Sequence, residues 1–270
     1  MDYKYKTIKI GKIVGTYYSC GYKTNVILVW AIGGPTVPDN GKLDAAPFIL
    51  QNKIDLFVPD YLGFGRSDGI FTPMNCINTL LLTYKHLKDG VAGVCSYDMS
   101  KTFLKYQRII FVGKSLGGAY VPLLPRFNKE IKEIGIFCGA LDQSEQGKVK
   151  GEETNEDFVR TIEDGGYKYL YRGFIKNKKL WWNHLNDLDG LSPMDNVQYL
   201  KNTKLFIAHG KKDEVIHYSQ ALKYIEAIKK EFPKSSNQFK LRLYKDGDHG
   251  KSTTNKATRE FLDWIGVGNP

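Results

Sequence analysis

This 270-residue sequence contains few cysteines and no long apolar run. The four cysteines lie far apart and include no C-x-x-C pair: Cys20, Cys76, Cys95 and Cys138. This spacing excludes the usual zinc-ligand pattern and the disulfide framework of a small secreted domain, and it favours reduced thiols. No apolar stretch approaches the ~20 residues of a membrane-spanning helix, and residues 1–6 lack the apolar core of a signal peptide. We therefore expect a cytoplasmic protein with no membrane span.

The chain also lacks a concentrated arginine patch, although its formal net charge is +10. The positive charge comes mainly from lysines spread along the chain, among them Lys4, Lys6, Lys9, Lys12, Lys176, Lys178, Lys179, Lys211, Lys212, Lys229 and Lys230. No zinc-finger spacing, aromatic RNA-binding motif or basic helix accompanies them. We therefore predict a solvated lysine surface and no nucleic-acid partner, with at most a mild attraction to acidic molecules.

Short apolar runs alternate with segments of helical periodicity along most of the chain. At 42% hydrophobic residues the chain can bury one large core, so we expect one domain with an insertion. The patterns predict strands over residues 7–14, 26–30, 54–58, 109–112, 134–138, 204–208 and 241–244, and helices over 43–51, 73–86, 97–106, 119–124, 219–231 and 252–265. Parallel strands joined by helical crossovers, an α/β architecture, follow from this order.

A sharp turn between strand and helix is predicted at Gly113-Lys114-Ser115-Leu116-Gly117-Gly118. A serine at the tip of such a turn needs a positive φ, which is tolerated only when small residues two before and two after allow close packing. Gly113 and Gly117 are those residues. The turn would expose the Ser115 hydroxyl at the carboxyl edge of the sheet beside the Leu116 amide, as an acyl-transfer nucleophile requires.

Four segments together resemble the α/β-hydrolase family, including its esterases, proline iminopeptidases and prolyl-oligopeptidase relatives. The 113–118 turn resembles the family's nucleophile elbow, and Gly33-Gly34-Pro35 resembles its H-G-G-P oxyanion loop, with Ile32 where histidine is usual. Residues 60–67 resemble its D-x-x-G-x-G-x-S turn, in which we expect Asp60 and Arg66 to support the neighbouring loops. Residues 209–216 resemble its H-G-x-x-D-x-x-V segment. In addition to these four segments, His249 follows the last predicted strand, where the family keeps its catalytic histidine.

The resemblance implies a Ser-His-Asp triad of Ser115, His249 and Asp213, with the backbone N–H groups of Gly34 and Leu116 as the oxyanion hole. Asp142 and Glu214 are the rival acids, while His209 is expected to structure the loop before Gly210. This chemistry needs no metal and no cofactor.

The resemblance also implies an α/β-hydrolase fold with a mostly parallel central sheet flanked by helices and a small helical cap inserted after the sixth strand. We assign the core to residues 1–141 and 196–270, and the cap (lid) to residues 142–195, which contain no apolar strand-like run. The cap is rich in aromatic residues: Phe158, Tyr167, Tyr169, Tyr171, Phe174, Trp181 and Trp182. Trp181 and Trp182 are candidates to line the substrate pocket. Alternatively, these side chains anchor the cap to the core.

The expected function is hydrolysis of carboxylic esters with small or medium acyl groups through an acyl-enzyme. One alternative is an aminopeptidase, in which Glu152, Glu153 or Glu156 would bind the α-ammonium group of a short peptide. Another is a non-catalytic binding protein built on the same fold. The expected partner is a small-molecule ester or short peptide, and the sequence assigns no oligomeric state.

Overall fold

The computed structural model describes residues 4–267 and contains a ten-stranded sheet. Its strands are β1 (Tyr5–Ile10), β2 (Ile13–Tyr18), β3 (Val26–Ala31), β4 (Asp55–Pro59), β5 (Val91–Cys95), β6 (Lys101–Leu104), β7 (Arg108–Lys114), β8 (Glu133–Phe137), β9 (Lys204–Gly210) and β10 (Phe239–Tyr244). Their order across the sheet is β10-β9-β8-β7-β3-β4-β2-β1-β5-β6. The strands from β10 to β4 pair in parallel and the remaining pairs are antiparallel. The prediction of a mostly parallel α/β sheet is confirmed.

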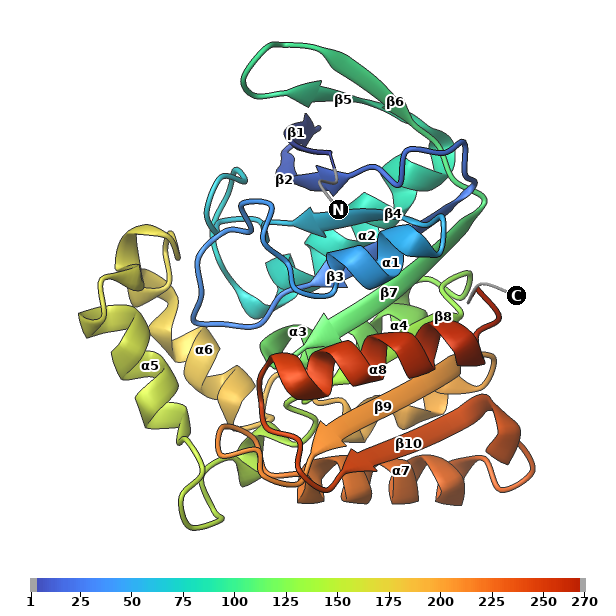
Figure 1. Cartoon of the computed structure of the whole chain (residues 1–270). Helices are drawn as coiled ribbons and strands as arrows, with labels where there is room; N and C mark the ends of the chain where they lie inside the picture. Colours follow the sequence, from blue (N-terminus) through green and yellow to red (C-terminus); the bar gives the residue numbers. More distant parts are fainter. Residues whose placement is uncertain (1–3, 268–270) are drawn as a thin grey trace.

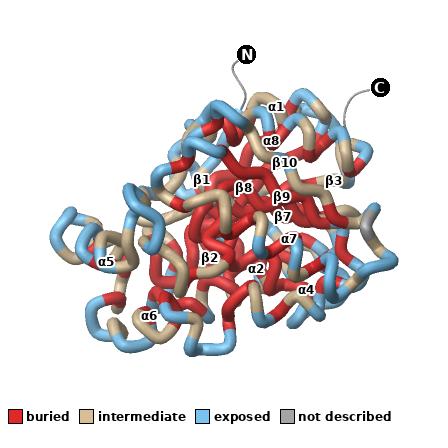
Figure 2. The backbone as a smooth tube through the Cα atoms, turned by 90° about the horizontal axis from the view of Figure 1, so that it is seen from below, coloured by how far each residue is buried: buried red, intermediate tan, exposed pale blue. Residues whose placement is uncertain are grey.

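Helices cover both faces of this sheet. They are α1 (Ala46–Gln51), α2 (Pro73–Asp89), α3 (Leu116–Tyr120), α4 (Leu124–Phe127), α5 (Asn155–Asp164), α6 (Lys178–Leu185), α7 (Ser219–Glu231) and α8 (Lys251–Trp264), with short 3₁₀ turns between several of them. Figures 1 and 2 show α1 and α8 on one face and α2, α4 and α7 on the other. None of the helices within residues 4–267 combines the length and apolarity needed to cross a bilayer.

The buried core follows the central parallel strands, which are the most apolar segments of the chain. In β3 and β7 nearly every residue is buried, because helices exclude water from both sides of a parallel sheet. Residues Val26–Ala31 of β3 pair in register with Arg108–Gly113 of β7. Figure 2 shows these strands inside the buried centre of the molecule. The loop 32–45 after β3 and the turn at Ser115 after β7 therefore start from a rigid base.

Two parts of the sequence-based prediction are wrong. The segment 7–14 is not one strand: Gly11, with φ 60°, turns the chain back so that β1 and β2 form a hairpin. Residues 97–106 were expected to be helical, but β5 and β6 form a second hairpin over 91–104, which pairs with β1 and extends the sheet. Pairing with a distant strand overrides the local helical preference here.

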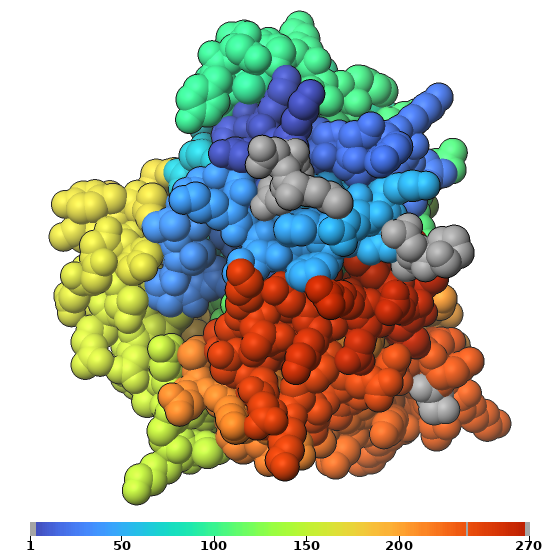
Figure 3. Space-filling model, in the orientation of Figure 1, coloured from blue at the N-terminus to red at the C-terminus, as the bar shows by residue number. Residues whose placement is uncertain are grey.

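Residues 142–195, the predicted cap, leave the sheet after β8. This is the eighth strand along the chain, whereas the prediction placed the cap after the sixth. Five strands were predicted from the sequence before this point, and the two hairpins add three more. The segment consists of short helices that include α5 and α6, and none of its described residues belongs to a strand of the sheet. Figure 1 shows α5 and α6 beyond the carboxyl ends of β7 and β9, and in Figure 3 the same residues form a yellow-green lobe against the blue N-terminal loops.

Candidate active site

Ser115 occupies the tip of the turn between β7 and α3 with φ 54° and ψ −123°. An L-residue adopts this conformation only under tertiary constraint. The flanking glycines explain how the turn packs: a Cβ on Gly113 would lie 2.2 Å from the Gly117 carbonyl oxygen, and one on Gly117 would lie 2.2 Å from the Ala31 carbonyl oxygen. The strained serine and the two glycines that the motif predicted are therefore present in one turn.

His249 contacts Asp213 at the carboxyl edge of the sheet. Its Nδ1 lies 3.0 Å from Oδ1 and 2.9 Å from Oδ2 of the Asp213 carboxylate. Asp213 follows β9 and His249 follows β10, and these strands are parallel neighbours. The Asp213 Oδ1 also accepts hydrogen bonds from the backbone N–H groups of Val215 and Ile216. These contacts fix the orientation of the Asp213 carboxylate beside the His249 imidazole.

Asp213 remains ionised in this setting. Burial alone would raise the pKa of its carboxyl, but hydrogen bonds from His209 and His249 outweigh burial and hold that pKa below its usual range. His209 is fully buried, with Nε2 3.2 Å from Asp213 Oδ2 and 2.8 Å from the Ile216 carbonyl oxygen. His209 was expected only to structure the loop before Gly210. In the structure it also contacts the Asp213 carboxylate directly.

The rival acids lie elsewhere. The Asp142 Oδ1 accepts from the Ser144 hydroxyl, and Glu214 is exposed. Within residues 4–267, neither of the two carboxylates forms a hydrogen bond or ion pair with His249. Of the three candidate acids, Asp213 alone contacts the imidazole.

Cys138 is the nearest group that could join Asp213 and His249 around a metal ion. Its Sγ and one atom from each of those residues lie within 4.8 Å of one another. Burial and the Asp213 carboxylate raise the pKa of the Cys138 thiol above its usual range. The Asp213 carboxylate already contacts His249 Nδ1 and accepts from two backbone N–H groups, an arrangement that forms an acid–imidazole pair without any metal ion.

A small cavity adjoins Ser115 and both predicted oxyanion residues. It has a volume of about 50 Å³ and is lined from the core by Gly34, Ser115, Leu116, Ala140, Val215 and Ile216, and from the cap by Gln143, Gln146, Glu153, Thr154, Asn155, Phe158 and Leu185. In the described part of the chain, the backbone N–H groups of Gly34 and Leu116 donate to no other group. Ser115 and the two residues predicted to form the oxyanion hole therefore line one cavity.

Ser115 and His249 are not hydrogen-bonded among the residues that the structure describes. Catalytic hydrogen bonds are often long or poorly aligned before substrate binds. Ser115 is 8% exposed, and the His249 side chain is 20% exposed. Ser115 is thus nearly buried and His249 partly exposed, and both follow carboxyl ends of parallel strands.

Neither predicted cap tryptophan lines this cavity. Trp181 is fully buried and stacks on Phe71, with ring centroids 4.7 Å apart, and its indole N–H donates to the Phe71 carbonyl oxygen. Trp182 is half-buried and packs against the same core. The alternative interpretation, that aromatic residues anchor the cap, describes these two side chains.

Tyr171 contacts the glycine loop beside the cavity, a role that the sequence interpretation did not assign to it. Its hydroxyl accepts a hydrogen bond from the Thr36 backbone N–H at 2.7 Å, and its ring lies 4.8 Å from that of Phe64 and 4.7 Å from that of Phe71. A Cβ on Gly34 would lie 3.3 Å from the Tyr171 hydroxyl. Tyr171 thus connects the cap to the glycine loop. The sequence interpretation could not single out Tyr171 among the many aromatic residues of the cap, because composition does not show which aromatic side chain has a hydrogen-bond partner.

Asp60 and Arg66 form the loop support that the sequence suggested. The Arg66 guanidinium donates to both Asp60 oxygens, at 2.8 Å and 2.9 Å, and also reaches the hydroxyls of Thr7 and Thr16. Asp60 is fully buried. The pair fastens the 60–67 loop to β1 and β2.

Part of this chain is similar to a known protein family, and its fold is similar to that of several solved structures. Residues 168–266, which include Asp213 and His249 but not Ser115, match the model of the prolyl oligopeptidase family. A search of curated proteins finds no match. An esterase from Pyrococcus furiosus is similar in structure, with TM-score 0.66 and 17% identity over 97% of this chain and 91% of that chain.

Two further structures show the same likeness. Est1E from Butyrivibrio proteoclasticus has TM-score 0.61 and 16% identity over 98% of this chain and 99% of that chain. A puromycin-hydrolyzing peptidase from Mycobacterium tuberculosis has TM-score 0.61 and 12% identity over 97% of this chain, which spans only 40% of the peptidase. Taken with the parallel sheet and its serine turn, these likenesses show that the chain has the α/β-hydrolase fold.

Proposed function

We propose that this protein is a serine hydrolase that cleaves carboxylic esters of small acyl groups. The observation that carries the proposal is that Ser115, in its strained turn, lines one cavity with Gly34 and Leu116, whose backbone N–H groups donate to no other group within residues 4–267. A helix packed on a sheet needs no strained serine and no pair of unbonded donors beside it. An acyl-transfer site needs both.

The reaction would proceed in two steps. Ser115 Oγ attacks the ester carbonyl while His249 Nε2 takes the hydroxyl proton, which then passes to the departing alcohol as the C–O bond breaks. Water then attacks the acyl-enzyme, gives its proton to the same nitrogen and releases the acid, so that Ser115 regains its hydrogen. Asp213, ionised and 2.9 Å from His249 Nδ1, orients the ring and stabilises the imidazolium.

The size of the cavity supports a short acyl group. A single water needs roughly 10–15 Å³ of such space, so a cavity of about 50 Å³ accepts an acyl chain of only a few atoms. Phe158 and Leu185 of the cap, with Ile216 of the core, supply apolar walls. We expect turnover of acetyl and propionyl esters to exceed that of octanoyl esters.

The test is turnover of p-nitrophenyl acetate by the wild type and by Ser115→Ala and His249→Ala. We expect each substitution to reduce kcat by about 10⁴-fold or more. Ser96→Ala, which removes an exposed hydroxyl from the turn between β5 and β6, is the control and should retain activity. Undiminished turnover in Ser115→Ala would sink the proposal.

The aminopeptidase alternative is favoured by one observation. Glu153 lines the cavity beside Ser115, and across the described residues no cation pairs with its carboxylate. Glu152 is not available for that role, because its carboxylate accepts hydrogen bonds from the backbone N–H groups of Gly147 and His217. A free Glu153 could bind the α-ammonium group of an aminoacyl substrate.

Aminoacyl naphthylamides and p-nitrophenyl esters separate the two activities. An aminopeptidase would cleave the amides, and Glu153→Gln would raise their KM while leaving ester KM within about twofold. Exclusive ester turnover supports our proposal. A folded wild type that fails to react with a fluorophosphonate probe would instead indicate the non-catalytic binding protein.

A further inference from the structure

A second cavity lies at the edge of the sheet opposite Ser115. It has a volume of about 630 Å³ and is lined by Tyr84, Lys88, Gln107, Arg108, Ile109, Lys129, Glu130, Lys132, Glu133, Asn202 and Lys204. These residues surround the amino ends of β7, β8 and β9, whereas Ser115, Asp213 and His249 follow carboxyl ends. The seven residues of β7 separate the two sites by roughly 20 Å. The proposed active site therefore does not account for this cavity.

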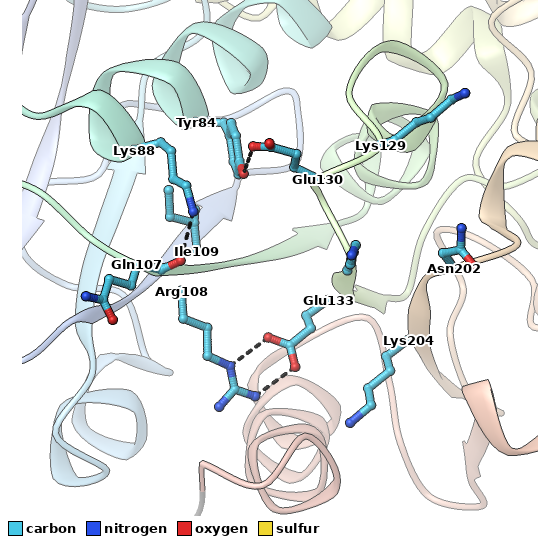
Figure 4. A pocket seen from close by; sticks show the side chains of 11 residues that line it. Tyr84, Lys88, Gln107, Arg108, Ile109, Lys129, Glu130, Glu133, Asn202 and Lys204 are labelled. Carbon is cyan, nitrogen blue, oxygen red and sulfur yellow. Dashed lines mark hydrogen bonds and ion pairs between the residues drawn. The ribbon is translucent and has the colours of Figure 1, made fainter.

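The acidic groups of the cavity are already engaged. The Arg108 guanidinium donates to both Glu133 oxygens, each at 2.7 Å, and also to the Ile265 carbonyl oxygen. The Glu130 carboxylate accepts from the Tyr84 hydroxyl at 2.9 Å. Figure 4 shows the Arg108–Glu133 pair between Lys88 and Lys204. Because Arg108 neutralises Glu133, only Glu130 remains to offset the other cations.

Four lysines of the cavity have no acidic partner. Within residues 4–267, Lys88, Lys129, Lys132 and Lys204 form no ion pair, and the one hydrogen bond from their ammonium groups joins Lys88 to the Gln107 carbonyl oxygen at 3.3 Å. A concave wall that carries unpaired charges of one sign concentrates the field and attracts counter-ions.

We propose that this cavity binds a soluble small molecule that carries two or more linked phosphate groups. Lysine ammonium groups are point charges that donate in several directions, which suits the many oxygens of a phosphate chain. A single carboxylate would use at most two of the four lysines. The planar guanidinium that recognises a carboxylate with two bonds is already occupied by Glu133. The volume lies within the range of small-molecule sites.

Inorganic triphosphate is the probe that tests this proposal, by calorimetry and by thermal shift at about 50 mM salt. We expect saturable binding to one site per chain. Lys132→Gln/Lys204→Gln should weaken binding by about tenfold or more, since two charged contacts to the phosphate oxygens are lost. The matched control is Lys229→Gln/Lys230→Gln, which removes the same charge from exposed positions at the end of α7. This control should bind within about twofold of the wild type.

Three outcomes would overturn the proposal. One is no saturable binding to the wild type. Another is equal weakening in both double variants, which would mean that only net charge attracts the probe. The last is equal competition by sulfate at matched ionic strength, which would mean that the cavity does not distinguish linked phosphates. All four substituted lysines are exposed, and the melting temperatures of the unliganded variants verify that they fold.

Discussion

At the level of single residues, the backbone of Ser115 has a strained conformation. Its φ of 54° and ψ of −123° cost on the order of 1–3 kcal/mol for a residue with a side chain. The turn maintains this conformation because β7 and α3 are both packed on the sheet and the flanking glycines allow backbone contact. The strained residue lines the same cavity as Gly34 and Leu116.

We predict that Ser115→Gly is more stable than Ser115→Ala by about 1 kcal/mol, although both are inactive. Glycine relieves the strain, and this gain exceeds the 0.5–1 kcal/mol that its greater freedom in the unfolded chain costs. Urea unfolding of both variants measures the difference.

The control for that comparison is Ser252, in the first turn of α8, where φ is not positive. There the order should reverse, with Ser252→Gly about 0.5–1 kcal/mol less stable than Ser252→Ala. A glycine that destabilises both positions equally would show that Ser115 is not strained.

At the level of secondary-structure elements, a cap residue, Tyr171, contacts a loop of the core. Tyr171 follows the 3₁₀ turn Tyr167–Tyr169, and its hydroxyl holds the loop that carries Gly34 through the Thr36 N–H. This loop follows β3 without regular structure over residues 32–45, so a cap residue contributes to the position of a predicted oxyanion donor.

Tyr171→Phe should lower kcat by about tenfold while changing the free energy of unfolding by only about 1 kcal/mol. The ring and its contacts with Phe64 and Phe71 remain, but the bond to Thr36 is lost. Steady-state kinetics on p-nitrophenyl acetate measure the effect. Tyr169→Phe, at a 78% exposed position nearby, is the control. A proportional loss in both variants would argue against a role in positioning Gly34.

Strands that are apolar on both faces were predicted correctly from the sequence. Strands that form only because they pair with a distant strand were not predicted. The parallel strands β3, β7, β8 and β9 were predicted from apolar runs, and α7 was predicted at its observed bounds of 219–231. The hairpin over 91–104 was missed. Its stability depends on β1, more than eighty residues earlier, and a local pattern contains no trace of that partner.

At the scale of the whole molecule, the cap is continuous with the main hydrophobic core. Trp181 of α6 is buried against Phe71, Phe158 and Phe174, so residues from both sides of the predicted boundary fill one cluster. We therefore expect core and cap to unfold together and not as separate units.

Trp181→Ala should destabilise the whole chain by about 3–5 kcal/mol, because it leaves a large void in this cluster. Leu180→Ala, at the adjacent and 48% exposed position on α6, should change stability by less than about 0.5 kcal/mol. Urea unfolding followed by circular dichroism measures both. A raised KM in Trp181→Ala with unchanged global stability would favour the pocket-lining role instead.

The sequence by itself determined what depends on neighbouring residues: the apolar central strands, the α7 helix and the positive φ of Ser115 between glycines. It also contained all three proposed catalytic groups. Only the tertiary structure decided which acid contacts His249, that Tyr171 holds the glycine loop, that Trp181 belongs to the core, and that unpaired lysines surround a cavity at the opposite edge. The reason is physical: these contacts join residues that are distant along the chain, and the order of strands in the sheet brings them together.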